Sequence, residues 1–320
     1  MKISVIIPFY NLERFVDVTL DSVRAAAAAV EGTDTRIECV CVDDGSTDGT
    51  GAKLDAYASG SDGSSVLAFK IVHQRNGGEG AARNAGVAAA TGEWLTFLDG
   101  DDVWLPNAVR AAVSVSSEYP DADIAGFRFA PFVDGGDLPP VPACPGRVVR
   151  YESERKIPSE VILNLGVFPS LFRRSVFGDL AFSSLPLGAD RLYVAEAFVR
   201  ARHIVLSDEI VHGYRIRENS MARQPWNTRK IVSMIDYAVG SLRALSGSGK
   251  EVGREGVSYL ADVLLSVTRK QIFRMREDRG EAVRHWREAL ISMDVRLLPF
   301  GCRVRRILML ALCRLIGFLV

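Results

Sequence analysis

A regular alternation of short apolar runs and helical segments constrains the fold of this chain more than any other feature. The apolar runs favour buried strands and lie at 3–7, 37–42, 66–72 and 94–98. Between them lie segments with helical patterns or helix-start signals, at 12–30, 45–58 and 77–92. Strands that alternate with helices predict an α/β fold, in which helices cover both faces of a mostly parallel sheet.

Polar residues follow three of these strands at the point where each strand ends. The first strand runs into Pro8-Phe9-Tyr10-Asn11, the second into Asp43-Asp44-Gly45-Ser46 and the fourth into Asp99-Gly100-Asp101-Asp102. In an open parallel sheet, ligands bind in the crevice beyond the carboxyl ends of the strands. We therefore expect the three segments to converge on one binding site.

The segment from Asp99 to Asp102 places three carboxylates within four residues, directly after an apolar run. Carboxylates this close repel one another, and burial of the flanking strand raises the cost. A hard divalent cation, Mg²⁺ or Mn²⁺, is bound by oxygen ligands at this spacing, with phosphate oxygens in its other positions. The alternative is an aspartate-rich turn that caps the next helix. The position at a strand end favours a metal site, with Asp101 and Asp99 as ligands.

Asp43 and Asp44 form a second acidic pair at a strand end. Helix-start chemistry explains the residues at 46–50, with Ser46, Thr47 or Asp48 as the N-cap. It does not explain two adjacent carboxylates at the end of a buried strand. A carboxylate in that position can accept a hydrogen bond from the N–H of a pyrimidine base or from a ribose hydroxyl.

The glycine-rich segment 76–86, NGGEGAARNAG, opens the helix after the third strand. Backbone N–H groups and the helix dipole favour an anion there. The segment matches neither a Walker A loop nor a clean GxGxxG pattern, and its small residues can equally serve close packing of the helix on the sheet. Arg83 is the sharper candidate, because it is the one guanidinium in a helix of small residues.

Four motifs in order carry a resemblance to a known family: VIIPFYN, VDDGSTDGT, GGEGAARNAG and FLDGDD. Together they resemble the family 2 inverting glycosyltransferases with a GT-A fold, densely over residues 1–110 and loosely over 160–220. The resemblance implies a Rossmann-like α/β domain that binds a nucleotide-diphosphate sugar, with Mn²⁺ or Mg²⁺ as cofactor.

The resemblance also assigns roles to individual residues. It makes Asp101 the direct metal ligand, places Asp99 near the ribose or the metal, and leaves Asp102 to support the loop. Asp43 and Asp44 match the acidic pair near the base and the ribose. The residues that it assigns to the nucleotide sugar are Pro8, Tyr10, Asn11, Asp43, Asp44, Arg83, Asp99, Gly100 and Asp101.

A later signature of the family is an acidic pair that opens a helix, whose aspartate acts as general base. Asp190 fits this position, while Ala189 replaces the usual glutamate, a change that concerns the acceptor contacts more than the chemistry. The other role for Asp190 is the N-cap of a helix expected at 190–202, and both roles can hold at once.

The segment VHGYRIRENSMA at 211–222 resembles the part of the family that lies over the donor diphosphate. Tyr214, Arg215 and Ser220 match it. His212 stands where an aromatic residue is more usual, and a lone histidine is more often a hydrogen-bonded structural residue than a ligand. We therefore expect His212 not to bind metal or phosphate.

These assignments predict a metal-dependent inverting transfer of a sugar to a hydroxyl of a glycan or lipid-linked glycan, in surface polysaccharide synthesis. UDP is the nucleotide that the resemblance implies, while dTDP and GDP stay open. A nucleotidyltransferase would need a glycine-rich loop with a basic residue after the first strand, where this chain has PFYNLERF. A nucleotide-sugar-binding scaffold without catalysis is supported by Ala189 alone.

Composition sets the limits of this interpretation. The 320 residues are 48% hydrophobic, enough for one large domain or a domain with a helical appendage. Lys+Arg and Asp+Glu both number 39, so no global charge points to nucleic acid. We expect a catalytic domain over 1–225, with an exposed loop at 127–150, and a helical region over 226–320 that binds membrane or a second copy of the chain.

The remaining sequence features concern location. Five cysteines stand in no metal-binding spacing, which favours a reduced, cytoplasmic compartment. No run of 18 uncharged apolar residues occurs, so a spanning helix is not expected. The tail at 303–320 combines four arginines with an apolar run, which predicts peripheral contact with the inner face of the cell membrane. A buried core helix and a dimer contact are the alternatives.

Overall fold

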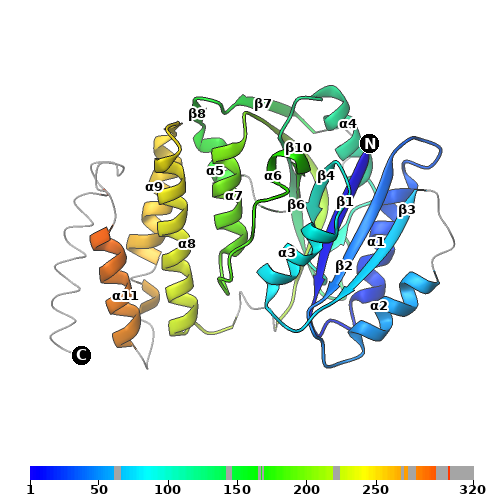
Figure 1. Ribbon diagram of the computed structural model, residues 1–320, viewed down its shortest axis with the longest axis horizontal. Helices are drawn as coiled ribbons and strands as arrows, with labels where there is room; N and C mark the ends of the chain where they lie inside the picture. The colour runs from blue at the N-terminus through cyan, green and yellow to red at the C-terminus, as the bar shows by residue number, and fades with distance from the viewer. Residues whose placement is uncertain are drawn as a thin grey trace. The chain divides into compact units, whose positions relative to one another are not determined.

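The structure, a computed structural model, describes residues 1–60, 66–141, 146–164, 167, 169–218, 224–267, 270–272, 279–292 and 302. The chain forms two compact units (Figure 1). The first comprises Met1–Glu152, Leu165–Ser184 and Arg200–Ser220, and the second comprises Ser153–Asn164, Leu185–Val199 and Met221–Val320. The expected domain boundary after residue 225 stays a prediction.

A nine-stranded mixed sheet forms the centre of the first unit, in the order β3-β2-β1-β4-β9-β6-β10-β5, with β7 beside β10. Its strands are β1 (Lys2–Phe9), β2 (Arg36–Asp43), β3 (Leu67–His73), β4 (Trp94–Phe97), β5 (Val103–Trp104), β6 (Ile124–Val133), β7 (Val148–Glu152), β9 (Ser170–Arg173) and β10 (His203–Ile216).

The first four strands are parallel, as the sequence predicts. The ladder of β1 and β2 pairs Phe9 with Asp43, and the ladder of β1 and β4 pairs Ile6 with Phe97. The carboxyl ends of these strands therefore meet at one edge of the sheet. Together with the helices on the sheet, this arrangement confirms the predicted α/β, Rossmann-like fold class.

The helices of the first unit cover both faces of β1. Alternate residues of β1, Ile3, Val5 and Ile7, point to one face of the sheet. They belong to the core cluster that also contains Val16 and Val109, which lie on two helices that cover this face. A Cβ on Gly86 would lie 2.3 Å from Ile6, so a third helix approaches the opposite face through a glycine. The helices of this unit are α1 (Val16–Ala28), α2 (Thr50–Ser59), α3 (Glu79–Ala89), α4 (Ala108–Glu118) and α6 (Arg174–Phe177).

The expected loop at 127–150 is wrong at both ends, because β6 continues to Val133 and β7 begins at Val148. Strand β10 runs parallel to β6 and pairs with it up to Ile216, which supplies hydrogen-bond partners along the strand. The local pattern conceals the strand, since Pro131 lies within it and prolines are unusual inside sheets. Strand β9 joins the two parallel parts by pairing antiparallel with both β4 and β6.

The second unit is mostly helical, and its helices α8, α9 and α11 pack side by side (Figure 1). The indole N–H of Trp286, a fully buried side chain, donates to the carbonyl of Leu264 over 2.7 Å. Its elements are α5 (Ser159–Asn164), α7 (Ala189–Arg200), α8 (Thr228–Gly247), α9 (Arg254–Asp262), the π-helical turn η2 (Val263–Val267), α11 (Arg279–Ser292) and a small ladder of β8 (Lys156–Ile157) with β11 (Glu251–Val252).

In the described part of the chain, no helix is both long and apolar enough to cross a membrane. The tail at 303–320, on which the predicted membrane contact depends, lies outside the described residues.

Candidate active site

Hydrogen bonds join the loops that follow β1 and β2. The backbone N–H of Asn11 donates to Oγ of Ser46 over 3.0 Å, and the N–H of Thr47 donates to Oδ1 of Asn11 over 2.8 Å. Asn11 has a φ of 52°, in the left-handed region that non-glycine residues seldom adopt and that clusters at functional sites. These contacts fix the loop, while the neighbouring Tyr10 is 48% exposed and Pro8 is buried.

Asp43 lies at the end of β2 between two donors. Its Oδ1 accepts from the N–H of Ser46 over 3.0 Å, and its Oδ2 lies 3.0 Å from Nδ1 of His73. Burial alone would raise the pKa of Asp43, but hydrogen bonds from Ser46 and His73 lower it below its usual value. The carboxylate is therefore held ionised, in a fixed direction, at the sheet edge where a ligand is expected.

Asp44 has a different environment, because its carboxylate organises the loop that precedes α3. It accepts from Nε2 of Gln74 over 2.7 Å and from the N–H groups of Gly77 and Gly78, each over 2.9 Å. Its side chain is buried. The structure thus gives Asp44 a clear supporting function, and its contact with a nucleotide stays a prediction.

Arg83 connects α3 to the acidic loop after β4. Its guanidinium donates to Oδ1 of Asp99 over 2.8 Å, forms an i,i+4 ion pair with Glu79 and lies over the ring of Phe182, 5.4 Å from the centroid. The side chain is almost completely buried. The sequence singled out Arg83 and Asp99 separately, and the fold brings them together.

Each of the three carboxylates in the acidic loop has a basic side chain or backbone donor beside it. Asp99 pairs with Arg83, and Asp101 forms an ion pair with Arg217. Asp102 is buried and lies 2.8 Å from Nε2 of His212. These partners compensate part of the crowded negative charge of the loop, and Arg217 was not among the predicted residues.

Asp102 also fixes the backbone of β10, since its Oδ1 accepts from the N–H of Arg215 over 2.7 Å. Nε of Arg215 in turn donates to the carbonyl of Asp101 over 2.6 Å. The guanidinium of Arg215 lies 4.7 Å from the ring centroid of Phe132 and 5.1 Å from that of Phe15. Arg215 is thereby a structural link between the acidic loop and β10. Ser220, its predicted companion, lies outside the described residues.

Gly100 is required by close packing of the acidic loop on the end of β1. A Cβ there would lie 2.7 Å from the carbonyl of Pro8, 2.7 Å from Phe9 and 2.9 Å from Leu12. Real Cβ atoms do not approach backbone so closely, so only glycine fits without movement of the loop. Its predicted place at the site therefore has a steric reason.

The acidic loop still carries more negative charge than its partners neutralise. Burial, opposed by Arg83 and reinforced by Glu79, raises the pKa of Asp99 well above its usual value. Burial, followed by the charge of Asp102, raises the pKa of Asp101 to about 6, although Arg217 opposes the change. Both shifts indicate carboxylates that an additional cation would stabilise.

The side chains at Asp99 and Asp101 fit a divalent cation in part. In the portion of the chain that the structure describes, no three His, Cys, Asp or Glu residues form a complete metal site. A cation held by two carboxylates would take its other ligands from water and from phosphate oxygens, as Mg²⁺ commonly does. The assignment of Mn²⁺ or Mg²⁺ to these residues stays a prediction.

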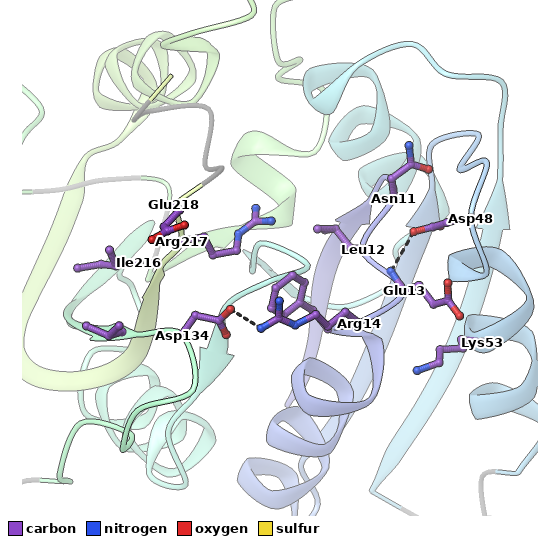
Figure 2. A pocket seen from close by; sticks show the side chains of 12 residues that line it. Asn11, Leu12, Glu13, Arg14, Asp48, Lys53, Asp134, Ile216, Arg217 and Glu218 are labelled. Atoms are coloured by element: carbon purple, nitrogen blue, oxygen red, sulfur yellow. Dashed lines mark hydrogen bonds and ion pairs between the residues drawn. The ribbon is translucent and has the colours of Figure 1, made fainter. Parts of the chain in front are cut away.

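A cavity of about 780 Å³ opens beside this loop in the first unit. Figure 2 shows Arg14 and Asp134 pointing toward each other as an ion pair at the cavity wall, which also includes Arg217. Its wall also includes Asn11, one of the predicted nucleotide residues. Three basic and four acidic side chains line the cavity, so it carries no strong net charge.

Asp190 belongs to the second unit and lies in the first turn of α7, where an N-terminal carboxylate is favoured. The turn before it rests on α8. Gly188 has a φ of 83°, and Ser233 both donates to the carbonyl of Leu187 and accepts from its N–H. The charge of Asp190 contributes to a raised pKa of Tyr237, after burial and Tyr259. Its role as general base stays a prediction.

The mostly parallel sheet with helices on both faces is a Rossmann-like α/β fold of the GT-A type. A family model described as "Glycosyl transferase family 2" matches residues 4–181, more than half of the chain. The chain therefore belongs to glycosyl transferase family 2, and the predicted family and enzyme class are confirmed at that level.

Curated relatives give the same family. The chain is 28% identical over 233 residues to the uncharacterized glycosyltransferase EpsJ of Bacillus subtilis, covering 70% of this chain and 64% of EpsJ. It is 31% identical over 220 residues to the succinoglycan biosynthesis protein ExoO of Rhizobium meliloti, and the alignment covers 63% of this chain and 58% of ExoO. The alignments to EpsJ and to two further curated glycosyltransferases span 64%, 39% and 35% of those proteins, so less than two thirds of each.

Solved structures share the fold. Residues 1–349 of Staphylococcus aureus TarS, in complex with UDP-GlcNAc, superpose with a TM-score of 0.72 at 20% identity, covering 98% of this chain and 90% of that one. The mannosyltransferase PcManGT of Pyrobaculum calidifontis, in complex with GDP-Man and Mn²⁺, gives a TM-score of 0.55 at 16% identity. The superposition covers 99% of this chain and 86% of the PcManGT chain.

Proposed function

We propose that the protein is a metal-dependent inverting glycosyltransferase. It moves a sugar from a nucleotide-diphosphate sugar to a hydroxyl of a glycan or lipid-linked glycan, in surface polysaccharide synthesis. The observation that carries the proposal is the convergence of Asn11, Asp43, Arg83, Asp99 and Asp101 on the carboxyl ends of β1, β2 and β4. Ligand sites of open parallel sheets lie at this edge.

UDP is the nucleotide that we propose. TarS, the structure with the higher TM-score of the two described, was solved with UDP-GlcNAc, while PcManGT was solved with GDP-Man, so GDP remains the alternative. Asp43 suits a base N–H because its carboxylate is kept ionised by its neighbours. The name of ExoO, a succinoglycan biosynthesis protein, supports a polysaccharide acceptor.

In the proposed reaction, Asp190 accepts the proton of the acceptor hydroxyl as general base. The hydroxyl oxygen then bonds to the anomeric carbon from the side opposite the diphosphate. The bond from that carbon to the diphosphate oxygen breaks, and the configuration inverts. No covalent sugar–enzyme intermediate is required.

Asp101 and Asp99 would hold Mn²⁺ or Mg²⁺, which supplies Lewis-acid stabilisation of charge on the departing diphosphate. The protein's own part is to orient these carboxylates. Arg83 fixes the direction of Asp99, and Asp102 anchors the loop to β10. We place this reaction in the cytoplasm, with the tail at 303–320 as a peripheral contact to the membrane or, as the alternative, to a second copy of the chain.

The test is calorimetric titration of the full chain with UDP, dTDP and GDP, with and without Mn²⁺, followed by measurement of sugar release from the matching nucleotide sugar. We expect one nucleotide to bind with metal, and slow hydrolysis of its sugar conjugate. Binding without any hydrolysis or transfer would favour the scaffold, and failure of all three nucleotides to bind would overturn the proposal.

The role of Asp190 has its own experiment. Asp190→Asn should abolish transfer and leave the affinity for the nucleotide unchanged, because the base acts only on the acceptor. Glu196→Gln, a change in the same helix, serves as the matched control. Turnover by Asp190→Asn equal to that of the parent would exclude the base assignment.

A further inference from the structure

Two aromatic side chains lie together on the surface of the first unit. Phe129 on β6 is 55% exposed and Tyr214 on β10 is 36% exposed. Their ring centroids are 5.9 Å apart with an interplanar angle of 62°, an edge-to-face pair. Exposed apolar side chains that gather into one patch with a polar rim are typical of a binding surface.

The pair belongs to a longer apolar strip along the two parallel strands. The ladder pairs Phe129 with His212, Pro131 with Tyr214, and Val133 with Ile216. Paired residues of a parallel ladder point to the same face of the sheet. We call Phe129, Pro131, Val133 and Tyr214 the β6–β10 strip. All four are exposed, Val133 to 65%.

The acidic loop lies along the β10 side of the β6–β10 strip, and the cavity lies at the end of the strip near Val133. His212, on the strip's face, is the partner of Asp102. The backbone N–H of Arg215, the residue next to Tyr214, donates to Asp102, so Tyr214 lies beside the acidic loop. Burial, followed by the charges of Asp102, Asp101 and Asp99, raises the pKa of Tyr214. At the far end, Val133 and Ile216 line the cavity.

This combination of neighbours favours a sugar over other occupants. A pyranose has an apolar C–H face, which packs on an aromatic ring, and a rim of hydroxyls, which can donate to carboxylates. A lipid chain or an apolar protein surface would desolvate the acidic loop without supplying hydrogen bonds, which is costly.

We propose that the β6–β10 strip is an acceptor subsite, in which Phe129 packs against the C–H face of a pyranose ring of the glycan. Tyr214 forms the edge of this subsite on the side of the acidic loop. The inference rests on the proposed function, since it names where the acceptor of that reaction binds. Nothing in it depends on which nucleotide is used.

The test is saturation-transfer NMR on the full chain with the methyl glycosides of glucose, galactose, mannose and N-acetylglucosamine, in the presence of the nucleotide and Mn²⁺. We expect transfer to the ring C–H protons of at least one glycoside. Phe129→Ala should weaken its apparent affinity about three- to tenfold, the range expected for loss of one aromatic contact. Phe129→Tyr, which keeps the ring, should bind as the parent does.

Val18→Ala is the matched control, because Val18 lies on α1 and is 48% exposed. Its signal should equal that of the parent. Absence of transfer to every glycoside, or equal affinity in parent and Phe129→Ala, would overturn the inference. So would sedimentation with phosphatidylglycerol vesicles that depends on Phe129, which would make the strip a membrane contact.

Nucleotide titration of the same samples separates the two hypotheses. If the nucleotide binds and no glycoside does, the subsite is wrong while the proposed function stands. If no nucleotide binds, the proposed function itself fails. Unchanged nucleotide affinity in Phe129→Ala would also show that the variant is folded. If Phe129→Ala no longer bound the nucleotide, the comparison of Phe129→Tyr with the parent would decide.

Discussion

Nε2 of His212 lies 2.8 Å from Oδ2 of Asp102, and both side chains are almost fully buried. The other carboxylate oxygen of Asp102 accepts from the backbone of Arg215. Asp102 is thus committed to β10, while Asp99 and Asp101 remain partly exposed. The pair therefore divides the acidic loop into one structural carboxylate and two that can meet a ligand.

This pair predicts a stability effect. His212→Phe removes the partner of Oδ2 and leaves a buried carboxylate oxygen unsatisfied, which should lower the free energy of unfolding by about 3 kcal/mol. Urea unfolding measures it. Asp102→Asn and the double variant complete a cycle, in which the double variant should lose less than the sum of the single losses. Strict additivity would show that the two side chains do not act as a pair.

Metal-dependent binding should depend on Asp101. Asp101→Asn removes one negative charge and weakens the electrostatic attraction for a divalent cation, so we expect the Mn²⁺-dependent part of nucleotide affinity to fall at least tenfold, about 1.4 kcal/mol. Calorimetry with and without Mn²⁺ measures it. Asp137→Asn, at an exposed acidic residue of the same unit, is the control. An equal effect of both variants would mean that only net charge matters.

Close packing at Gly100 predicts that even a methyl group is harmful. Gly100→Ala should force the acidic loop away from Pro8 and Phe9, lowering stability by about 2 kcal/mol and weakening nucleotide binding. Thermal unfolding and titration measure the two effects. Gly60→Ala is the control, since a Cβ at Gly60 would make only an ordinary contact of 3.4 Å. Parent-like behaviour of Gly100→Ala would show that the loop can shift freely.

Glu38 predicts a pH dependence of stability far from the site. Burial would raise its pKa, but hydrogen bonds from Ser4 and Thr91 and the charge of Lys2 lower it from 4.5 to about 2. Because the folded pKa lies below the unfolded one, the stabilisation is complete above about pH 4.5 and is lost as the pH falls toward 2. Its size is of the order of 3 kcal/mol.

The measurement is urea unfolding of parent and Glu38→Gln across this pH range. The difference between them should shrink steadily as the pH falls. Glu31→Gln, at an exposed position of the same unit, should show no such trend. A difference that stays constant with pH would assign the effect of Glu38 to packing instead of ionisation.

The sequence predicted β1 to β4 and their polar ends because those strands are consecutive, buried and bounded by turn residues. Their pattern depends only on residues close together in the sequence, so it can be recognised without knowing which strands pair. The strands β6, β9 and β10 were not predicted, since their partners lie far away in the chain and Pro131 disguises β6 as a loop. Parallel pairing of β6 with β10 is a property of the tertiary fold alone.

The same division holds at the site. The sequence by itself determined the residue types at the sheet edge, Asp43, Arg83, Asp99 and Asp101, because motif order and strand ends are visible in one dimension. Only the tertiary structure decided their partners. Arg217, which pairs with Asp101, directly follows β10. That strand is about a hundred residues away from the acidic loop in the chain but pairs with β5, which directly follows the loop. Charge compensation acts over a few ångströms, so it becomes visible only once the chain is folded.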